Sequence, residues 1–399
     1  MKKILFVVNT LGRAGAELSL LNLLRKFEGS GYEISLYVLM EQGEIVKEVP
    51  SYVRILNPIF REESVLSKEG RRIMTRTVIK SFFRNGNYAW KFRYIVKNLL
   101  YMIKRKKIQM DKLLWRIISD GVGGIKESFD LAVAWLEGGS AYFVAERVNS
   151  TKKVAFIHID YEKAGYTREM DQDCWKCFNR IFVVSKEAEE KFWTVYPEYR
   201  KLTSVFPNII NQEYIRRRSK EPGGFLDDYD GVRILTVGRL EHQKGYDIAV
   251  EAMKLLKDSG YSVKWYVLGE GSQREILERK IAALGLEDDF ILLGAVENPY
   301  PYYVQSDLYV HAVRYEGQGI AVLEAQILGC AVVVSEYCGS QGQIENGKYG
   351  VLCKLTPIGI ANSVKVLLDD EERRRELGNA AATKKIPVGQ EKMLFELLK

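Results

Sequence analysis

Two cations follow one apolar run of the sequence within a short loop. Arg239 comes directly after the run Ile234–Val237 and Gly238. Lys244 stands five residues further on, just before a helix predicted to begin near residue 246. Guanidinium and ammonium groups make charge-assisted hydrogen bonds to phosphate oxygens, so two fixed cations at the end of a strand suit a diphosphate. The alternative is an exposed loop with two solvated cations.

A second group of residues combines two glycines with two carboxylates. Gly317 and Gly319 lie just before a predicted helix that begins near Ile320. Glycine lets backbone N–H groups approach a ligand closely, and the N-terminus of a helix attracts anions. Glu324 could accept hydrogen bonds from ribose hydroxyls, and Glu316 could lie against a sugar that is being transferred. The alternative is a simple glycine turn in which Glu316 complements the helix dipole.

Two further glycine pairs carry weaker signals. Gly269 and Gly271 follow an apolar run, as they would in any strand-to-helix turn. Gly12 and Gly15 follow the first apolar run, but their spacing is not that of the dinucleotide fingerprint. A nicotinamide cofactor is therefore rejected.

One histidine and one cysteine pair also fall at positions that could do chemistry. His158 closes a predicted strand, where a lone histidine is more often structural than functional. Cys174 and Cys177 have the spacing of half a zinc site or of a redox pair, but no second such pair accompanies them. No metal site is predicted.

The segments that must position these residues alternate between short β-branched or aromatic runs and longer amphipathic stretches. This alternation predicts an α/β protein with parallel sheets covered on both faces, whose ligand loops follow the carboxyl ends of the strands. The predicted strands are Ile4–Val8, Ile34–Leu39, Leu131–Leu136, Val154–His158 and Ile181–Val184 in the first half, and Ile234–Val237, Trp265–Leu268, Phe290–Leu293, Leu308–His311 and Val332–Ser335 in the second.

A chain of 399 residues predicts two domains. A polar, turn-rich stretch at 211–231 is expected to link a first domain at 1–210 to a second at 232–380. The remaining segment, 381–399, is expected to form a C-terminal helix that packs back on the first domain.

The positive charge of the chain is concentrated in one segment. Residues 61–116 contain sixteen Lys or Arg and four Asp or Glu, a local charge of +12, whereas the whole chain carries +7. From Trp90 onward, Tyr94, Ile95, Leu99, Met102 and Ile103 are expected on one helical face, with Lys91, Lys97 and Lys104 largely off it. Such a basic helical insertion could lie on an anionic membrane surface. Solvated cations on helices packed against the first domain are the alternative, and no nucleic-acid-binding module is recognised.

The hydrophobic content of 47% and the charged content of 28% are those of a soluble globular protein. The N-terminal run after Lys2 and Lys3 is too short for a signal peptide, and no apolar run is long enough to span a bilayer. The chain is expected in the cytoplasm, at the inner face of the plasma membrane.

In this order and at these spacings, the motifs resemble the retaining glycosyltransferases of family 4, also described as glycosyl transferases group 1. The matching pieces are the Gly238–Gly245 loop, the Leu268–Gly271 turn and the glutamate pair Glu316 and Glu324. The resemblance covers most of the second half and, more loosely, residues 1–50 and 130–210. It implies the GT-B fold, in which two Rossmann-like doubly wound domains face a cleft.

The resemblance also implies a role for each matching residue. Arg239 and Lys244 would bind the diphosphate of a nucleotide-sugar donor, and Glu324 would hold its ribose. Glu316 would lie beside the donor sugar, while amides near Gly319 and Ile320 would face the phosphates. In the first half, Gly15 would lie over the donor and His158 would reach the donor sugar or the acceptor.

The implied activity is metal-independent transfer of a hexose or N-acetylhexosamine, with retention, to a glycan or lipid-linked acceptor in bacterial surface-polysaccharide synthesis. No cofactor is expected beyond the donor, and a UDP-sugar is favoured over a GDP-sugar. Gln318 and Ala14 depart from the family pattern and are expected to tune sugar fit. An epimerase of the same fold and a non-catalytic donor-binding scaffold are the alternatives.

Overall fold

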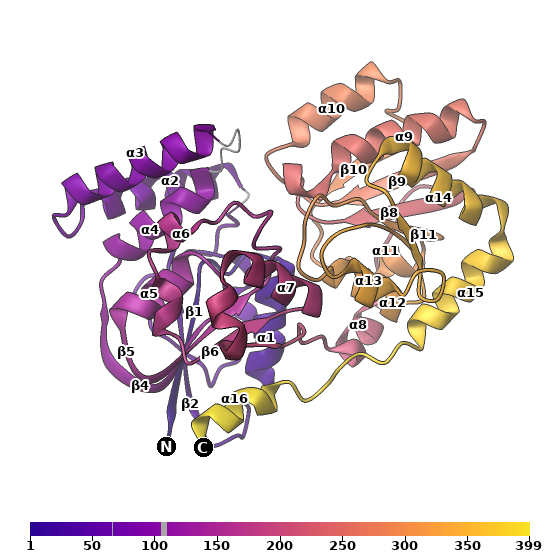
Figure 1. Cartoon of the computed structure of the whole chain (residues 1–399). Coiled ribbons are helices and arrows are strands. Elements are labelled where there is room, and N and C mark those ends of the chain that lie inside the picture. The colour runs from indigo at the N-terminus through magenta and orange to yellow at the C-terminus, as the bar shows by residue number, and fades with distance from the viewer. Residues whose placement is uncertain (66, 105–109) are drawn as a thin grey trace. The chain divides into compact units, whose positions relative to one another are not determined.

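All ten predicted strands form in the structure, a computed structural model that describes residues 1–65, 67–104 and 110–399 (Figure 1). Contacts among these residues divide the chain into two units. Unit 1 comprises Met1–Ile209 together with Pro387–Lys399, and unit 2 comprises Ile210–Ile386. Each unit is built on one parallel sheet, which agrees with the predicted α/β class.

The sheet of unit 1 has the strand order β3-β2-β1-β4-β5-β6-β7 within the described residues. The strands β3 and β7 were not predicted, because they are short edge strands with too few residues to show a pattern. The strands are β1 (Lys3–Val8), β2 (Glu33–Val38), β3 (Arg54–Ile55), β4 (Ile125–Ala134), β5 (Val148–Ile157), β6 (Arg180–Val183) and β7 (Thr203–Val205).

Helices cover the sheet of unit 1, and alternate residues of its central strands reach a buried core. Ile4, Phe6 and Val8 of β1 join this core together with leucines of α1. The helices are α1 (Gly15–Lys26), α2 (Lys68–Phe83), α3 (Tyr88–Lys104), α4 (Met110–Gly121), α5 (Gly139–Arg147), α6 (Arg168–Asp171) and α7 (Lys186–Val195), with short 3-10 helices η1 (Glu44–Glu48), η2 (Cys174–Cys177) and η3 (Pro197–Leu202).

The basic insertion forms α2, α3 and α4, and its predicted helical face needs correction. Tyr94 and Met102 of α3 are buried, but Ile103 is 52% exposed. Lys91, expected off the apolar face, is fully buried with them. Its ammonium pairs with Asp120 at 2.9 Å and donates to carbonyl groups at the C-terminal end of α2, so its charge is compensated. The cations at 105–107 lie outside the described residues.

The last helix, α16 (Glu391–Leu398), packs on unit 1. Leu394 and Leu398 are buried in its core. The ring of Phe395 lies 5.1 Å from that of Phe27, centroid to centroid, and 5.5 Å from that of Tyr32. The C-terminal segment therefore contributes apolar side chains to the first sheet's core.

The sheet of unit 2 has the order β10-β9-β8-β11-β12-β13 within the described residues. Alternate residues of β8, β9 and β11 enter two separate cores, one on each face, which is the arrangement of a doubly wound sheet. The strands are β8 (Val232–Val237), β9 (Val263–Leu268), β10 (Phe290–Gly294), β11 (Leu308–His311), β12 (Ala331–Ser335) and β13 (Val351–Cys353), the last of which the sequence analysis missed.

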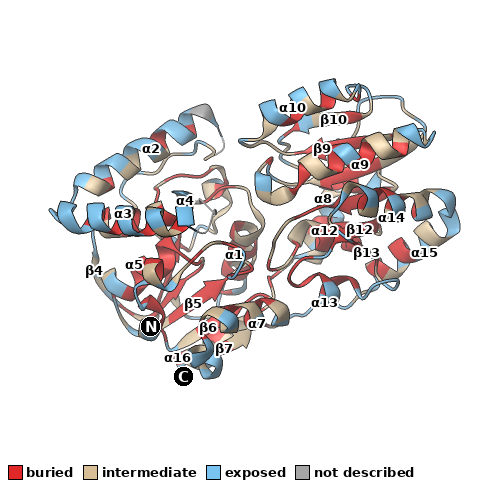
Figure 2. Ribbon diagram, turned by 45° about the horizontal axis from the view of Figure 1, so that its top comes forward, coloured by how far each residue is buried: buried red, intermediate tan, exposed pale blue. Residues whose placement is uncertain are grey.

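Helices α9, α10 and α14 of unit 2 supply one core and α8, α11 and α12 the other. Figure 2 shows the buried strands between exposed helical surfaces in this unit. The helices are α8 (Gln212–Arg218), η4 (His242–Lys244), α9 (Tyr246–Asp258), α10 (Arg274–Ala283), α11 (Tyr300–Val304), α12 (Ile320–Ile327), α13 (Ser340–Ile344), α14 (Pro357–Asp369) and α15 (Glu371–Ala382).

The segment at 211–231, expected to be a linker, belongs to unit 2 in the structure. The side chain of Asn211 caps α8 by accepting from the backbone N–H of Tyr214 at 2.9 Å. Ile215 is buried, and the ring of Phe225 lies 4.4 Å from that of Tyr266. These two apolar contacts pack the segment against unit 2, although its polar composition had suggested a linker.

Candidate functional site

The loops after β8, β9 and β10 are joined edge to edge by their backbones. The N–H of Gly238 donates to the carbonyl of Leu268 at 2.9 Å, and that of Gly269 donates to the carbonyl of Gly294 at 2.8 Å. The carboxyl ends of these strands therefore form a continuous edge, which is where open α/β sheets bind ligands.

Close backbone packing explains the glycines of the turn after β9. A Cβ atom at Gly269 would lie 1.9 Å from the carbonyl oxygen of Gly238, and one at Gly271 would lie 2.4 Å from that of Leu240. Any side chain would displace these loops. Because packing alone accounts for both glycines, their role in binding a ligand stays a prediction.

The loop that carries Lys244 is fixed against the segment after β11. Gly245 has φ +63°, and a Cβ there would lie 2.2 Å from the carbonyl oxygen of Ala312. Gln243 donates its amide to the carbonyl of Tyr315 at 2.7 Å. Arg314 pairs with Asp247 at the start of α9, at 2.9 and 2.7 Å. These contacts hold the loop after β8 beside the residues that lead into the two-glycine turn.

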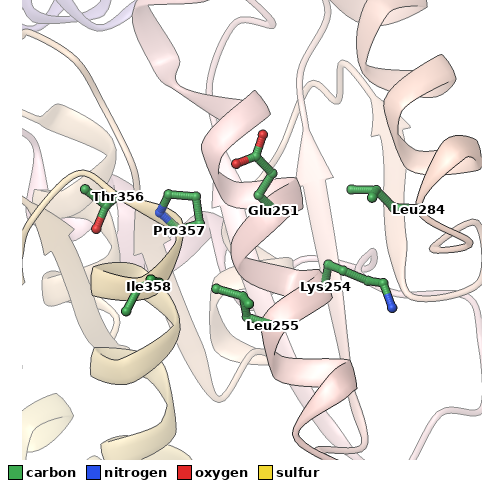
Figure 3. Close-up of a pocket in the computed structure, with 7 residues that line it drawn as sticks. All are labelled: Glu251, Lys254, Leu255, Leu284, Thr356, Pro357 and Ile358. Atoms are coloured by element: carbon green, nitrogen blue, oxygen red, sulfur yellow. The ribbon is translucent and has the colours of Figure 1, made fainter.

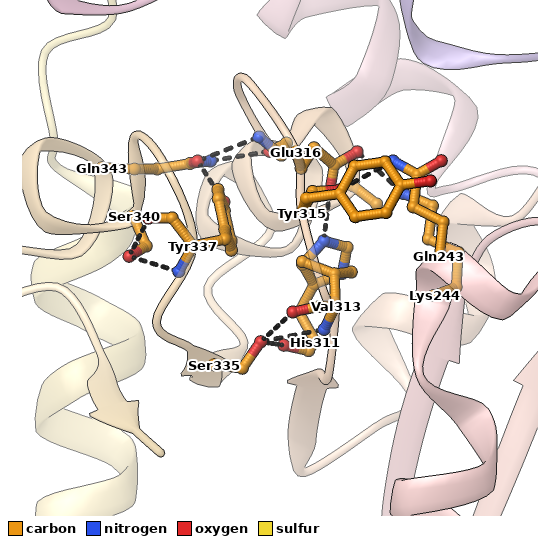
Figure 4. Close-up of polar contacts among 12 residues, drawn as sticks. Gln243, Lys244, His311, Val313, Tyr315, Glu316, Ser335, Tyr337, Ser340 and Gln343 are labelled. Atoms are coloured by element: carbon orange, nitrogen blue, oxygen red, sulfur yellow. Dashed lines mark hydrogen bonds and ion pairs between the residues drawn. The ribbon is translucent and has the colours of Figure 1, made fainter. Parts of the chain in front are cut away.

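Lys244, Glu316 and His311 form one polar cluster (Figure 4). The Nζ atom of Lys244 donates to Oε1 of Glu316 at 2.7 Å, and Nε2 of His311 lies 2.7 Å from the other carboxylate oxygen, Oε2. The side chains of Lys244 and Glu316 are only 14% and 17% exposed, and that of His311 is 2% exposed. The structure thus places two predicted site residues in direct contact and adds a histidine to them.

The cluster keeps Glu316 ionised. Burial alone would raise the pKa of its carboxyl group, but Lys244 and His311 together lower it to about 2. Burial lowers the pKa of His311, although Glu316 opposes this effect. At neutral pH the cluster therefore contains an ammonium group, a carboxylate and a neutral imidazole.

Arg239 stands at the same sheet edge but differs from Lys244 in its surroundings. Its side chain is exposed, and within the described ranges no carboxylate forms an ion pair with it. An exposed guanidinium without a carboxylate partner is available for an anionic ligand.

The turn that contains Gly317 and Gly319 is held by hydrogen bonds from a side chain that was not predicted from the sequence. Gln343 of α13 accepts from the N–H of Gly319 at 3.1 Å and donates to its carbonyl at 2.6 Å. The hydroxyl of Tyr337 donates to the same amide oxygen at 2.7 Å. The amide of Gly319, expected to face phosphates, is therefore engaged within the protein, and the N–H groups from Ile320 onward are those that point out of the start of α12.

Glu324 is buried within α12, and two tyrosines of α11 hold its carboxyl group. Tyr300 and Tyr303 donate their hydroxyls to its two oxygens, each at 3.2 Å. Burial raises the pKa of Glu324 to about 7, although both tyrosine hydrogen bonds act in the opposite direction. The carboxyl group thus changes its charge close to neutral pH.

The two site residues predicted in the first half lie in unit 1. Gly15 is the first residue of α1, directly after the loop that follows β1. His158 follows β5, and its backbone N–H donates to Oε2 of Glu137 at 3.0 Å. Burial lowers the pKa of the His158 imidazole to about 4, so it is neutral at physiological pH.

His311 was predicted only as the last residue of a strand, and no role was predicted for Tyr300, Tyr303 or Gln343. These residues lie 5 to 24 positions away from the groups they contact. Their partners are fixed by the packing of β11, α11 and α13 against α12, which no local pattern reveals.

A cavity of about 390 Å³ lies elsewhere on unit 2, between α9 and the start of α14 (Figure 3). None of the predicted site residues lines it, and its walls are mostly apolar. Its lining residues are Glu251, Lys254, Leu255, Leu284, Thr356, Pro357 and Ile358. Among the residues that the structure describes, no three His, Cys, Asp or Glu side chains are grouped as metal ligands would be.

Comparison with solved structures identifies the fold. The chain superposes on HepE of Anabaena, solved with UDP and glucose, with a TM-score of 0.68 and 15% identity over 100% of this chain and 99% of that one. It superposes on TarM of S. aureus with a TM-score of 0.67 and 14% identity over the whole of both chains. The predicted GT-B fold is confirmed.

Comparison with curated sequences gives relatives that this chain matches over about half of their length or less. One is an N-acetylgalactosaminyltransferase of Campylobacter jejuni whose name gives a diphospho-undecaprenol-linked acceptor, 27% identical over 50% of this chain and 53% of the relative. Another is the alpha-D-kanosaminyltransferase of Streptomyces kanamyceticus, 32% identical over 37% of this chain and 39% of the relative.

The family model described as "Glycosyl transferases group 1" matches residues 222–384, which include almost all of unit 2. This range contains Arg239, Lys244, Glu316 and Glu324, together with the side chains that hold them. Residues 222–384 of the chain are therefore similar to the glycosyl transferases group 1 family.

Proposed function

We propose that the chain is a retaining glycosyltransferase that transfers a hexose or N-acetylhexosamine from a UDP-sugar to a lipid-linked glycan. One observation carries the proposal: a buried lysine–glutamate pair and an exposed arginine stand at the same sheet edge as the start of α12. A cation beside a helix N-terminus suits a diphosphate, and a neighbouring carboxylate suits the hydroxyls of a sugar. Together they fit a ligand in which a diphosphate and a sugar are adjacent.

Each group has a distinct task in this proposal. Arg239 and Lys244 bind the diphosphate, and the amides at the start of α12 add partial positive charge. Glu316 accepts hydrogen bonds from hydroxyls of the donor sugar. Glu324 accepts from the ribose hydroxyls, and it does so most strongly in its ionised form.

The chemical step breaks the bond between the anomeric carbon and the β-phosphate oxygen and forms a bond from that carbon to the acceptor oxygen. The acceptor's proton passes to the departing phosphate oxygen on the same face of the sugar, which gives retention. Negative charge develops on the leaving UDP, and Lys244 and Arg239 stabilise it. We expect turnover to survive EDTA, because these cations supply the required charge.

Two observations support the proposal that the acceptor is lipid-linked. The relative from Campylobacter jejuni acts, by its name, on a glycan carried by diphospho-undecaprenol. In addition, nine of the eighteen large hydrophobic residues that are exposed in the described chain fall between Ile79 and Met110. Such a concentration on one segment is unusual for a surface that faces only water.

The exposed apolar residues of α3 form one stripe, which differs from the face predicted from the sequence. The stripe consists of Phe92, Val96, Leu100 and Ile103, and the exposed cations Arg93, Lys97 and Lys104 flank it. Figure 2 shows exposed residues, drawn in pale blue, along α3. We propose that this stripe rests on an anionic lipid surface. Among the described helices, none has the length and apolar character of a membrane span.

A transfer assay tests the proposed activity. The purified chain is incubated with UDP-N-acetylgalactosamine, UDP-N-acetylglucosamine or UDP-glucose and with a polyprenyl-diphosphate-linked disaccharide. We expect UDP release together with a trisaccharide whose new linkage keeps the donor's anomeric configuration by NMR. Isomerised donor without a new linkage would identify an epimerase, and UDP binding with neither product would identify a scaffold.

Vesicle co-sedimentation tests the membrane surface. The double variant Lys97→Glu/Leu100→Ser should lose about tenfold or more in affinity for vesicles containing anionic lipid, because each cation near the surface contributes about 1 kcal/mol. The matched control is Lys220→Glu/Leu226→Ser, which makes the same two changes at exposed positions of unit 2. Equal binding by the two variants contradicts the proposed surface.

A further inference from the structure

His311 is a buried histidine at the end of a strand, beside Glu316. It is the last residue of β11, its side chain is 2% exposed, and its Nε2 atom lies 2.7 Å from Oε2 of Glu316. The hydroxyl of Tyr309 lies 3.1 Å from its other ring nitrogen, Nδ1. Both ring nitrogens are therefore engaged, one by a carboxylate and one by a hydroxyl.

The partners of the ring determine which nitrogen carries the proton. An ionised carboxylate can only accept, so Nε2 must carry the hydrogen that points to Glu316. In the neutral imidazole Nδ1 is then an acceptor, and the hydroxyl of Tyr309 supplies its donor. Glu316 thus fixes the tautomer, and the hydroxyl of Tyr309 is compatible with it as a donor to Nδ1.

The backbone around His311 is also held in place. The N–H of Val313 donates to the hydroxyl oxygen of Ser335 at 2.8 Å, and the same hydroxyl lies 3.2 Å from the carbonyl oxygen of His311. Figure 4 shows these contacts below the carboxylate of Glu316. The imidazole is therefore a fixed donor rather than a side chain free to follow its partner.

Glu316 needs such a fixed partner once the donor is bound. Its second oxygen, Oε1, is held by Lys244, which the proposed function assigns to the diphosphate. A diphosphate near Lys244 competes for this ammonium group and repels the carboxylate at the same time. With Lys244 as its sole donor, Glu316 would turn away from the phosphates or take up a proton.

We propose that His311 is a positioning residue that holds Glu316 in place against the donor sugar while Lys244 binds the diphosphate. This inference rests on the proposed function, because it assumes that Glu316 contacts the sugar of a UDP-sugar. His311 itself does not touch the substrate. Its effect should therefore appear in the binding of the sugar portion and not in the binding of UDP.

Calorimetric titration with UDP and with UDP-N-acetylgalactosamine, UDP-N-acetylglucosamine and UDP-glucose separates these two contributions. The His311→Leu variant should bind the UDP-sugar that the wild type binds best with about tenfold lower affinity, because a hydrogen bond to a charged group is lost. Its Kd for UDP should stay within threefold of the wild-type value. His311→Gln keeps an N–H donor near the position of Nε2 and should restore the UDP-sugar affinity. Tyr261→Phe removes a hydrogen bond to the carboxylate of Asp369, beyond the C-terminal end of α9, and is the matched control.

Each alternative result has a distinct meaning. UDP-sugar affinity unchanged in His311→Leu overturns the inference and leaves the proposed function standing. Equal loss of UDP and UDP-sugar binding, without rescue by His311→Gln, shows a merely structural histidine and also overturns it. A wild-type chain that binds neither UDP nor any of the three UDP-sugars overturns the proposed function and this inference together.

Discussion

Replacing Lys244 by methionine removes one charge and preserves most of the side chain's volume. The ammonium group lies 2.7 Å from Glu316, and both side chains are more than four-fifths buried. If this group stabilises the departing diphosphate, its loss should lower kcat about 10²- to 10³-fold, as does the loss of one oxyanion donor. UDP release from a saturating UDP-sugar measures this effect.

The same substitution should also destabilise the fold. Removing one partner of a buried pair costs about 3–5 kcal/mol, and the lower end applies here because His311 still donates to Glu316. The double variant Lys244→Met/Glu316→Gln removes both charges and should recover most of this stability, as measured by urea unfolding, without recovering turnover. That separation distinguishes a catalytic cation from a structural one.

A second lysine in unit 2 provides the control. Lys257 pairs with Asp289 at 2.9 Å, but its side chain is 33% exposed. Lys257→Met should cost at most about 1 kcal/mol and change turnover less than twofold. A folded Lys244→Met variant with turnover within tenfold of wild type would refute the assigned role.

Three further changes test other parts of the site. Arg239→Ala should lower kcat about 10²-fold or more while leaving the midpoint of urea unfolding nearly unchanged, because its side chain is exposed. Glu324 keeps its proton in the folded state up to a pKa of about 7, so the folded state loses stability as pH rises from about 4.5 to 7. Glu324→Gln should therefore raise the free energy of unfolding by up to about 3 kcal/mol at pH 8 and by little at pH 4. The same substitution should weaken UDP binding, as measured by calorimetry. Gly271→Ala should lower the Tm in calorimetric scans, because its Cβ would meet the carbonyl oxygen of Leu240 at 2.4 Å.

The sequence by itself determined the α/β class, the ten longer strands and the residues at the carboxyl ends of β8 and β11. Hydrophobic runs of four or more residues have a detectable pattern, whereas edge strands as short as Arg54–Ile55 do not. The glutamates, Lys244 and Arg239 were found because their spacing around glycines is local. The structure confirmed the fold and brought Lys244 into contact with Glu316 across 72 positions of sequence.

Tertiary structure decided which side chains hold these groups and which surfaces remain exposed. The sequence pattern correctly placed Tyr94 and Met102 on the buried face of α3 but wrongly placed Ile103 there. Lys91 joined the buried face because Asp120, on another helix, compensates its charge. His311, Tyr303 and Gln343 acquire their partners only when β11, α11 and α13 pack around α12. The pattern of residue types in a segment predicts which of its side chains can be buried. The hydrogen-bond partner of a buried polar group depends on which distant segment packs against it, and the local pattern does not contain that information.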